Sequence, residues 1–207
     1  MEKNEPHVNT MALSHMEQKY SEKFEYSGPW GNSLSGTREF LVTCESLSNQ
    51  SILVQIENFN QEARVFRDNY LAVKYQAETI EFFQNASINV FNETTVFYDV
   101  FKDGLSPDLP ANAKLSEFLA DTRVPLIIMI EVRASEFVSE EQAEKVAQLI
   151  AASGACFYLT IVAVEDSSFG TFDRESLGEQ IAMRHFVRCV QITRLNGDMR
   201  TVSLRKE

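Results

Sequence analysis

Three acidic residues near the end of one apolar run are of a type that could bind a metal ion, although the spacing of a calcium-binding loop is absent. Glu165 and Asp166 follow a run that is typical of a buried strand, and Asp173 comes after a glycine-containing loop. Ligands often bind at the carboxyl ends of strands, and carboxylate oxygens are the ligands that Mg²⁺ and Ca²⁺ prefer. These residues are therefore a candidate metal site. The alternative is that Asp173 caps the next helix while Glu165 and Asp166 mark the exit of the chain into water.

A second candidate is the densest group of polar and aromatic residues in the chain. Its candidate binding residues are Arg64, Arg67, Tyr70 and Lys74, which could hold an anion or the carboxylate of a partner. The alternative is that they pair with the surrounding acidic residues and pack their stems on the core. Trp30, flanked by glycine and proline, is either an exposed contact residue or a buried one.

Other patterns that carry chemistry are missing from the sequence. Neither of the glycine-rich phosphate-binding patterns occurs, and Gly-x-Ser-x-Gly is absent. Of the three histidines, only His185 is near a well-structured region, and it lacks a paired carboxylate or nucleophile motif. We therefore assign no catalytic residue and predict no cofactor.

The composition indicates a folded, acidic protein. In 207 residues, 44% are hydrophobic, including 15 Phe, and the net charge is −11. Because nucleic-acid binding draws on clustered Lys and Arg, we predict no nucleic-acid partner. No stretch is rich enough in Gly, Ser or Pro to separate domains, so we expect a disordered polar tail at 1–9 and a single domain at 10–207.

The cysteines and the N-terminus bear on the compartment. Cys44, Cys156 and Cys189 each lie in an apolar run, have no zinc-binding spacing, and are predicted to be small core residues. One disulfide in an oxidising compartment stays open. No apolar run is long enough to cross a bilayer, and no leader is visible. The chain as it stands predicts a cytoplasmic protein, and the alternative is an exported or lipid-anchored one whose leader was removed.

The elements that must position these residues follow from periodicity. Helices are expected at about 10–23, at 69–91 with Asp68 as N-cap, at 114–121 and from 172–174 to 186; strands are expected at 38–45, 51–57, 94–101 and 187–193. The first two strands, joined by a short polar connection, predict a hairpin.

The clearest pattern runs from 124 to 164 and predicts a strand, a helix and a second strand. Val124 opens a β-branched apolar run, and another apolar run covers 156–164. Between them, Ser139 and Gln142 have the spacing of a capping box, and Gly154 is placed to end the helix in the left-handed conformation.

Asn196-Gly197 is a strong signal for a tight hairpin turn, which predicts that the tail at 199–204 folds back as an edge strand. Pairing of that edge with its own copy would make a homodimer. Because hairpins interrupt the alternation of helices and strands, we expect an α+β fold with a mixed, largely antiparallel β-sheet flanked by helices.

Four segments carry a resemblance to a known group of proteins. They are Tyr20-Ser-Glu-Lys-Phe-Glu-Tyr26, Gly28-Pro-Trp-Gly31, Arg67-Asp-Asn-Tyr-Leu-Ala-Val-Lys-Tyr75 and Gly104-Leu-Ser-Pro-Asp-Leu-Pro110. Together they resemble an uncharacterised family from Gram-positive gut bacteria, some members of which begin with a lipoprotein leader. The resemblance implies an envelope location if a leader was removed, and it implies no activity.

The sequence therefore supports two functional hypotheses. The first is a non-enzymatic binding or protein-interaction domain with an unknown protein partner, such as an accessory or cell-envelope protein. The alternative is a metal-dependent hydrolase or transferase that uses the acidic loop at 165–173.

Overall fold

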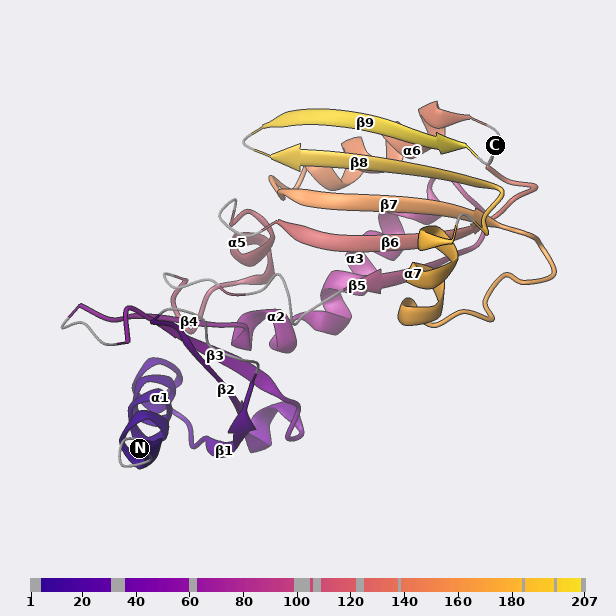
Figure 1. The fold of residues 1–207 in the computed structure, drawn as a ribbon. Helices are drawn as coiled ribbons and strands as arrows, with labels where there is room; N and C mark the ends of the chain where they lie inside the picture. The colour runs from indigo at the N-terminus through magenta and orange to yellow at the C-terminus, as the bar shows by residue number, and fades with distance from the viewer. Residues whose placement is uncertain are drawn as a thin grey trace. The chain divides into compact units, whose positions relative to one another are not determined.

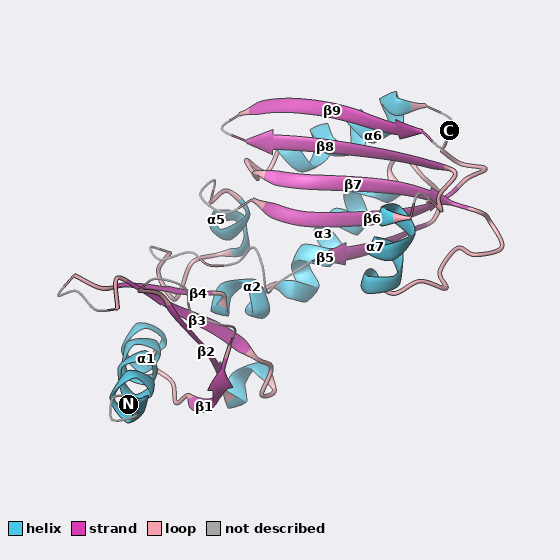
Figure 2. Cartoon of the chain, in the orientation of Figure 1, coloured by secondary structure: helices cyan, strands magenta, loops and turns pink. Residues whose placement is uncertain are grey.

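The computed structural model describes residues 5–30, 36–59, 63–98, 105, 109–121, 125–137, 139–183, 185–195 and 197–205. The expected features at 1–4, 99–101, Val124 and Asn196 lie outside these residues. The chain forms two compact units, one of residues 1–75 and 100–114 and the other of 76–99 and 115–207. The fold is α+β, as predicted, with two sheets in the described chain (Figures 1 and 2). The expectation of one domain stays a prediction.

The first unit is a four-stranded antiparallel sheet with a helix against it. Its elements are α1 (Glu5–Tyr20), β1 (Glu25–Pro29), β2 (Arg38–Thr43), the 3₁₀ turn η1 (Glu45–Leu47), β3 (Ile52–Glu57), β4 (Val65–Asp68) and α2 (Tyr70–Lys74). The strands pair in the order β1-β2-β3-β4, which confirms the predicted hairpin of β2 and β3. Helix α1 begins at Glu5, so residues 5–9 continue the helix and are not part of a polar tail.

The second unit is built on a five-stranded mixed sheet in the order β5-β6-β7-β8-β9. Its elements are α3 (Gln76–Ile88), β5 (Thr94–Tyr98), α5 (Leu115–Leu119), β6 (Leu126–Arg133), α6 (Glu140–Ala151), β7 (Phe157–Val164), α7 (Arg174–Ala182), β8 (Arg188–Leu195) and β9 (Asp198–Arg205). Strands β6 and β7 pair in parallel over eight residue pairs, and α6 connects them. The predicted strand-helix-strand unit is therefore confirmed.

Helices cover both faces of this sheet. Val146 and Ile150 of α6 are fully buried, and α3 and α6 lie on the same face (Figure 1). On the opposite face, Leu177 of α7 packs with Val162 and Val164 of β7. The pattern of buried residues explains the β-branched apolar runs of β6 and β7, because central strands covered on both faces exclude water from most of their side chains.

The ends of α6 match the sequence signals. The Ser139 amide donates to Gln142 Oε1 at 3.0 Å, as a capping box requires. Gly154, three residues after the helix, has φ of +88°, and a Cβ there would lie 3.3 Å from the Cβ of Ala120. Glycine is therefore required at position 154 by its backbone conformation and by the close approach of Ala120.

One expected helix is divided in the structure. The helix predicted at 69–91 is divided into α2 and α3 at Tyr75, whose hydroxyl donates to the carbonyl of Ala113 at 2.7 Å. Asp68 is not the N-cap residue; Asn69 holds that place, and its side chain accepts from the Leu53 amide at 2.7 Å. Long-range side-chain hydrogen bonds are thus made at the start of α2 and at the residue that divides the expected helix.

Substitution of Gly154 tests this part of the fold. We expect Gly154→Ala to lower the free energy of unfolding by about 1 to 2 kcal/mol, because a left-handed conformation is costly for an L side chain. Gly178→Ala is the control, since Gly178 lies inside α7 and a Cβ added there would meet no atom within 4 Å. In that control, the free energy of unfolding should rise by up to about 1 kcal/mol, because alanine has a higher helix propensity than glycine. Equal effects in urea unfolding would contradict the account.

Candidate functional site

The residues of the predicted anion site are each engaged separately. Arg67 Nε lies 2.7 Å from Glu57 Oε1, and Arg64 Nε donates to the Phe59 carbonyl at 3.1 Å. Tyr70 is buried at 7% exposure, whereas Lys74 Nζ lies over the ring of Tyr75. Of these contacts, the ion pair of Arg67 with Glu57 is of the kind that the structural alternative predicts, and ligand binding here stays a prediction.

Trp30 follows β1, and its backbone amide donates to the Glu39 carbonyl at 3.0 Å. Its side chain is 44% exposed. The ring is therefore accessible to a partner, as one of the two sequence-based alternatives requires.

A buried carboxylate, Asp68, is at the centre of a polar cluster that it forms with Lys19, Tyr20 and the Tyr70 amide in the first unit. Its side chain is 2% exposed, and Lys19 Nζ and the Tyr20 hydroxyl lie 2.7 Å and 2.6 Å from its two oxygens. The Tyr70 amide also donates to Asp68 Oδ1 at 3.1 Å. Burial and the neighbouring Asp68 charge raise the pKa of Tyr20, so its hydroxyl stays a donor. The arrangement anchors α1 to the end of β4.

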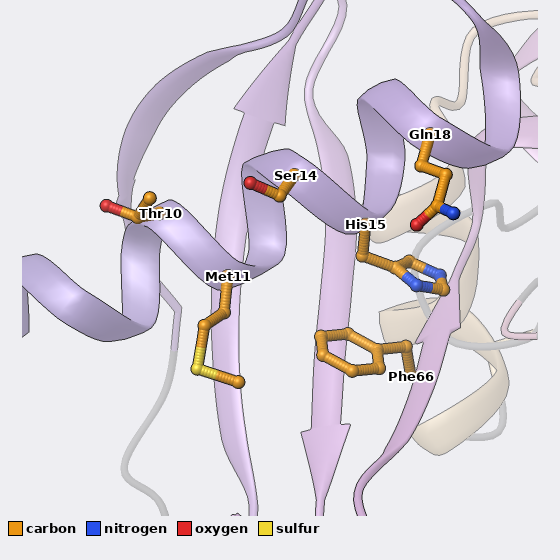
Figure 3. Close-up of a pocket in the computed structure, with 6 residues that line it drawn as sticks. All are labelled: Thr10, Met11, Ser14, His15, Gln18 and Phe66. Carbon is orange, nitrogen blue, oxygen red and sulfur yellow. The ribbon is translucent and has the colours of Figure 1, made fainter.

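Near this cluster, α1 and β4 form a hollow of about 320 Å³ (Figure 3). It is lined by Thr10, Met11, Ser14, His15, Gln18 and Phe66. The rings of His15 and Phe66 are stacked, with centroids 4.3 Å apart.

Desolvation by burial lowers the pKa of His15, which favours the neutral imidazole. Its Nε2 atom has no hydrogen-bond partner among the described residues. Ser14 precedes His15 on the same helix, and adjacent helical residues do not face each other. The hollow therefore presents a neutral, largely apolar lining and no nucleophile paired with a base.

In the second unit, the carboxylates of the predicted metal site have protein partners. Asp166 Oδ1 accepts from the Ser135 amide at 3.2 Å, and Asp173 Oδ1 accepts from the Ser176 amide at 2.8 Å, where it caps α7. Hydrogen bonds from Ser135 and Ser176 lower the pKa of Asp166 and Asp173, respectively. Glu165 is exposed.

Across the described ranges, no group of three or more His, Cys, Asp or Glu side chains is arranged to hold a metal ion. The observed role of Asp173 is the helix cap that the sequence offered as its alternative. Metal binding by the acidic loop stays a prediction.

Glu131 is a buried carboxyl group that the sequence analysis did not single out. It lies on β6 with no exposed area, and its Oε1 accepts from the Gly170 amide at 3.1 Å. Burial raises its pKa, while the Gly170 hydrogen bond and the charge of Arg133 act in the opposite direction. The signal that could have found it is one acidic residue inside an otherwise apolar run.

The same loop is held to β6 by Arg133. Its guanidinium donates to the Asp166 carbonyl at 3.0 Å and lies 4.3 Å from the ring centroid of Phe169. Phe169 in turn packs against the buried cluster under α7. These contacts fix the loop as a cover for the sheet.

One edge of the five-stranded sheet in the second unit is β9. This strand pairs with β8 over eight residue pairs, from Leu195 with Asp198 to Arg188 with Arg205, and stands at the end of the sheet order. The predicted hairpin is therefore confirmed, and Gly197 has the positive φ that a tight turn needs. Along the strand, the side chains of Met199 and Val202 are 39% and 56% exposed.

Comparison of the chain with models of protein families, with curated proteins and with solved structures found no match. The resemblance to a family from gut bacteria is thus neither supported nor opposed. No helix in the described ranges is long and apolar enough to cross a membrane.

Removal of the Asp68 carboxylate should destabilise the protein. We expect Asp68→Ala to lower the free energy of unfolding by about 3 kcal/mol, because it leaves the ammonium of Lys19 largely buried without its partner. Arg67→Ala is the control, since it breaks a neighbouring ion pair that is about one-third exposed and should cost no more than about 1 kcal/mol. A smaller loss for the Asp68 variant in denaturant unfolding would contradict the role given to Asp68.

Glu131→Gln should change how stability depends on pH. Because burial raises the pKa of Glu131 in the folded state, its neutral form is favoured, and the wild type loses that stabilisation as pH rises through the folded-state pKa. Glutamine stays neutral and can still accept from the Gly170 amide.

The variant should therefore gain in melting temperature relative to the wild type as pH rises above the ordinary carboxyl range of about 4, with little difference at the acidic end. Glu165→Gln, at an exposed site, is the control and should follow the wild-type profile. A constant offset across the pH range would show that ionisation of Glu131 is not the cause.

Proposed function

We propose that this protein is a non-enzymatic protein-interaction domain that binds a β-strand of its partner along the free edge of β9. The observation that supports the proposal is that β9 pairs on one side only, with β8, within the described chain. An unpaired edge presents a row of backbone donors and acceptors, and addition of a strand to such an edge is a recurrent mode of protein recognition.

The pairing with β8 determines which backbone amides of β9 point toward β8 and which point outward from the edge. Leu195 and Asp198 pair on either side of a two-residue turn. In a hairpin with a two-residue turn, the residues that flank the turn form a hydrogen-bonded pair. Since hydrogen-bonded and non-hydrogen-bonded pairs alternate along an antiparallel ladder, the amides of Arg200 and Val202 face β8. The amides of Met199 and Thr201 then point away from the sheet.

The edge lacks two of the common devices that block pairing, a proline and a bulge. Its sequence from Asp198 to Arg205 contains no proline, and its register with β8 runs without a bulge. It carries Arg200 on an outer face, where Val202 is also exposed. A strand of this length that stays open to water is a template for pairing with another chain.

The enzymatic alternative has less support. Asp166 and Asp173 already accept hydrogen bonds from backbone amides, and an ion would compete with both contacts. The hollow on α1 has a neutral imidazole and no nucleophile paired with it. A metal-dependent activity of the loop at 165–173 is the second hypothesis, and ion binding by calorimetry would support it.

Amide hydrogen exchange tests strand addition directly. The ¹⁵N-labelled protein is studied by NMR in two samples, one of the protein alone and one in unlabelled lysate of the source cells. In at least one of the two samples, the amides of Met199 and Thr201 should exchange at least about tenfold more slowly than the amides of an unpaired edge strand. The amides of Arg200 and Val202 are the internal control, because β8 protects them in both conditions.

Thr201→Pro removes one outward amide and should abolish that protection at Met199, whereas Thr201→Val keeps the amide and should preserve it. Outward amides that exchange as freely as open-edge amides in both conditions would refute the proposed function.

A further inference from the structure

We infer that the strand added to β9 is β9 of a second copy of this chain, so that two five-stranded sheets join into one sheet of a homodimer. This inference rests on the proposed function of the β9 edge and names its partner. Three observations carry it: the register of β9, the faces of its side chains and their exposure.

Symmetry restricts how two copies of β9 can pair. A two-fold axis that relates two antiparallel neighbouring strands stands perpendicular to the sheet, so each face continues into the same face of the other copy. Side chains that oppose one another across an antiparallel pair lie on one face. Asp198, Arg200 and Val202 alternate with Met199 and Thr201, so residues with even numbers oppose only residues with even numbers.

The charges and the exposed apolar side chain favour the register centred on Val202 over the register centred on Arg200. A register centred on Arg200 would place two guanidinium groups directly opposite each other, which is destabilising. A register centred on Val202 instead places an apolar side chain that is 56% exposed against its own copy. The two Arg200 side chains are then separated by four residue steps along the strands, or about 14 Å.

The hydrogen-bond pattern agrees with this centre. Because the Val202 amide faces β8, the two copies of Val202 form a non-hydrogen-bonded pair, the type in which opposed side chains are closest. The outward groups of the odd-numbered residues, Met199 and Thr201 among them, then provide about eight hydrogen bonds across the two-fold axis. Every free backbone group of the central part of β9 is satisfied in this way.

The assembly also closes. Pairing of β9 with β9 uses the same surface of both copies and ends at two chains. The opposite edge of the described sheet is β5, a strand of five residues against the eight of β9. Pairing of β9 with β5 would join two different surfaces and would leave a free edge at each end for further copies.

Disulfide trapping tests the register. In Val202→Cys, the two Cα atoms at the centre would lie about 4.5 Å apart, within the range of a disulfide. Arg200→Cys is the matched control on the same strand and face, and its Cα atoms would be too far apart. The native cysteines Cys44, Cys156 and Cys189 are buried, so the wild type gives the background.

We expect Val202→Cys to form a covalent dimer at least about tenfold faster than Arg200→Cys under oxidised glutathione. Light scattering of the reduced wild type, across micromolar to submillimolar concentrations, should give twice the 23.6 kDa of one chain. A single-chain mass throughout would overturn the inference. A dimer in which Val202→Cys is no faster than the control would also overturn it, because another surface would then hold the copies together.

The outcomes separate this inference from the proposed function. A single-chain mass together with slowed exchange of the Met199 and Thr201 amides in lysate means that a different protein supplies the strand, so that only the homodimer is wrong. A single-chain mass together with open-edge exchange in both conditions refutes both.

Discussion

The parallel pairing of β6 with β7 is the constraint on which the second unit depends. Eight residue pairs join these central strands, and their side chains are buried on one face by α3 and α6 and in part on the other by α7. A parallel pair needs a crossover between its strands, which α6 supplies from a capped start to the glycine at position 154. Once this pair is fixed, β8 and β9 can only add outward, and β9 becomes an edge.

The sequence predicted this unit well because its signals are local. The β-branched runs, the capping box and the glycine turn each lie within a few residues of the element that they define. Helix α1, by contrast, was placed five residues too late, since charged and polar residues at its start carry no apolar period. Strands β1 and β4 were not predicted; β1 contains Gly28 and Pro29, and β4 has only four residues.

The polar clusters were less accessible to sequence reasoning because their partners are distant in the chain. Asp68 is 49 residues from Lys19, and no local pattern relates the two. A single sequence could identify Arg67 and Tyr70 as members of a polar group. It could not show that Arg67 pairs with Glu57 of the neighbouring strand or that the ring of Tyr70 stacks on Tyr20. Asp173 could be recognised as a helix cap because its partner is only three residues away.

Taken together, the described polar groups of greatest interest hold each unit together internally. Asp68 anchors α1, Arg133 and Asp166 hold the covering loop, and Asp173 begins α7. What the second unit leaves open is backbone, along an edge whose exposed side chains include Met199 and Val202. The proposal of strand addition rests on this open edge.

Sedimentation equilibrium of two charge variants, alone and mixed, tests the central claim most directly. Val202→Lys and Val202→Glu each place like charges opposite each other at the two-fold axis, so each should sediment as a single chain. An equimolar mixture should form a heterodimer, because opposite charges then meet. Variants that remain dimeric alone, or a mixture that remains monomeric, would contradict the pairing of β9 with its own copy.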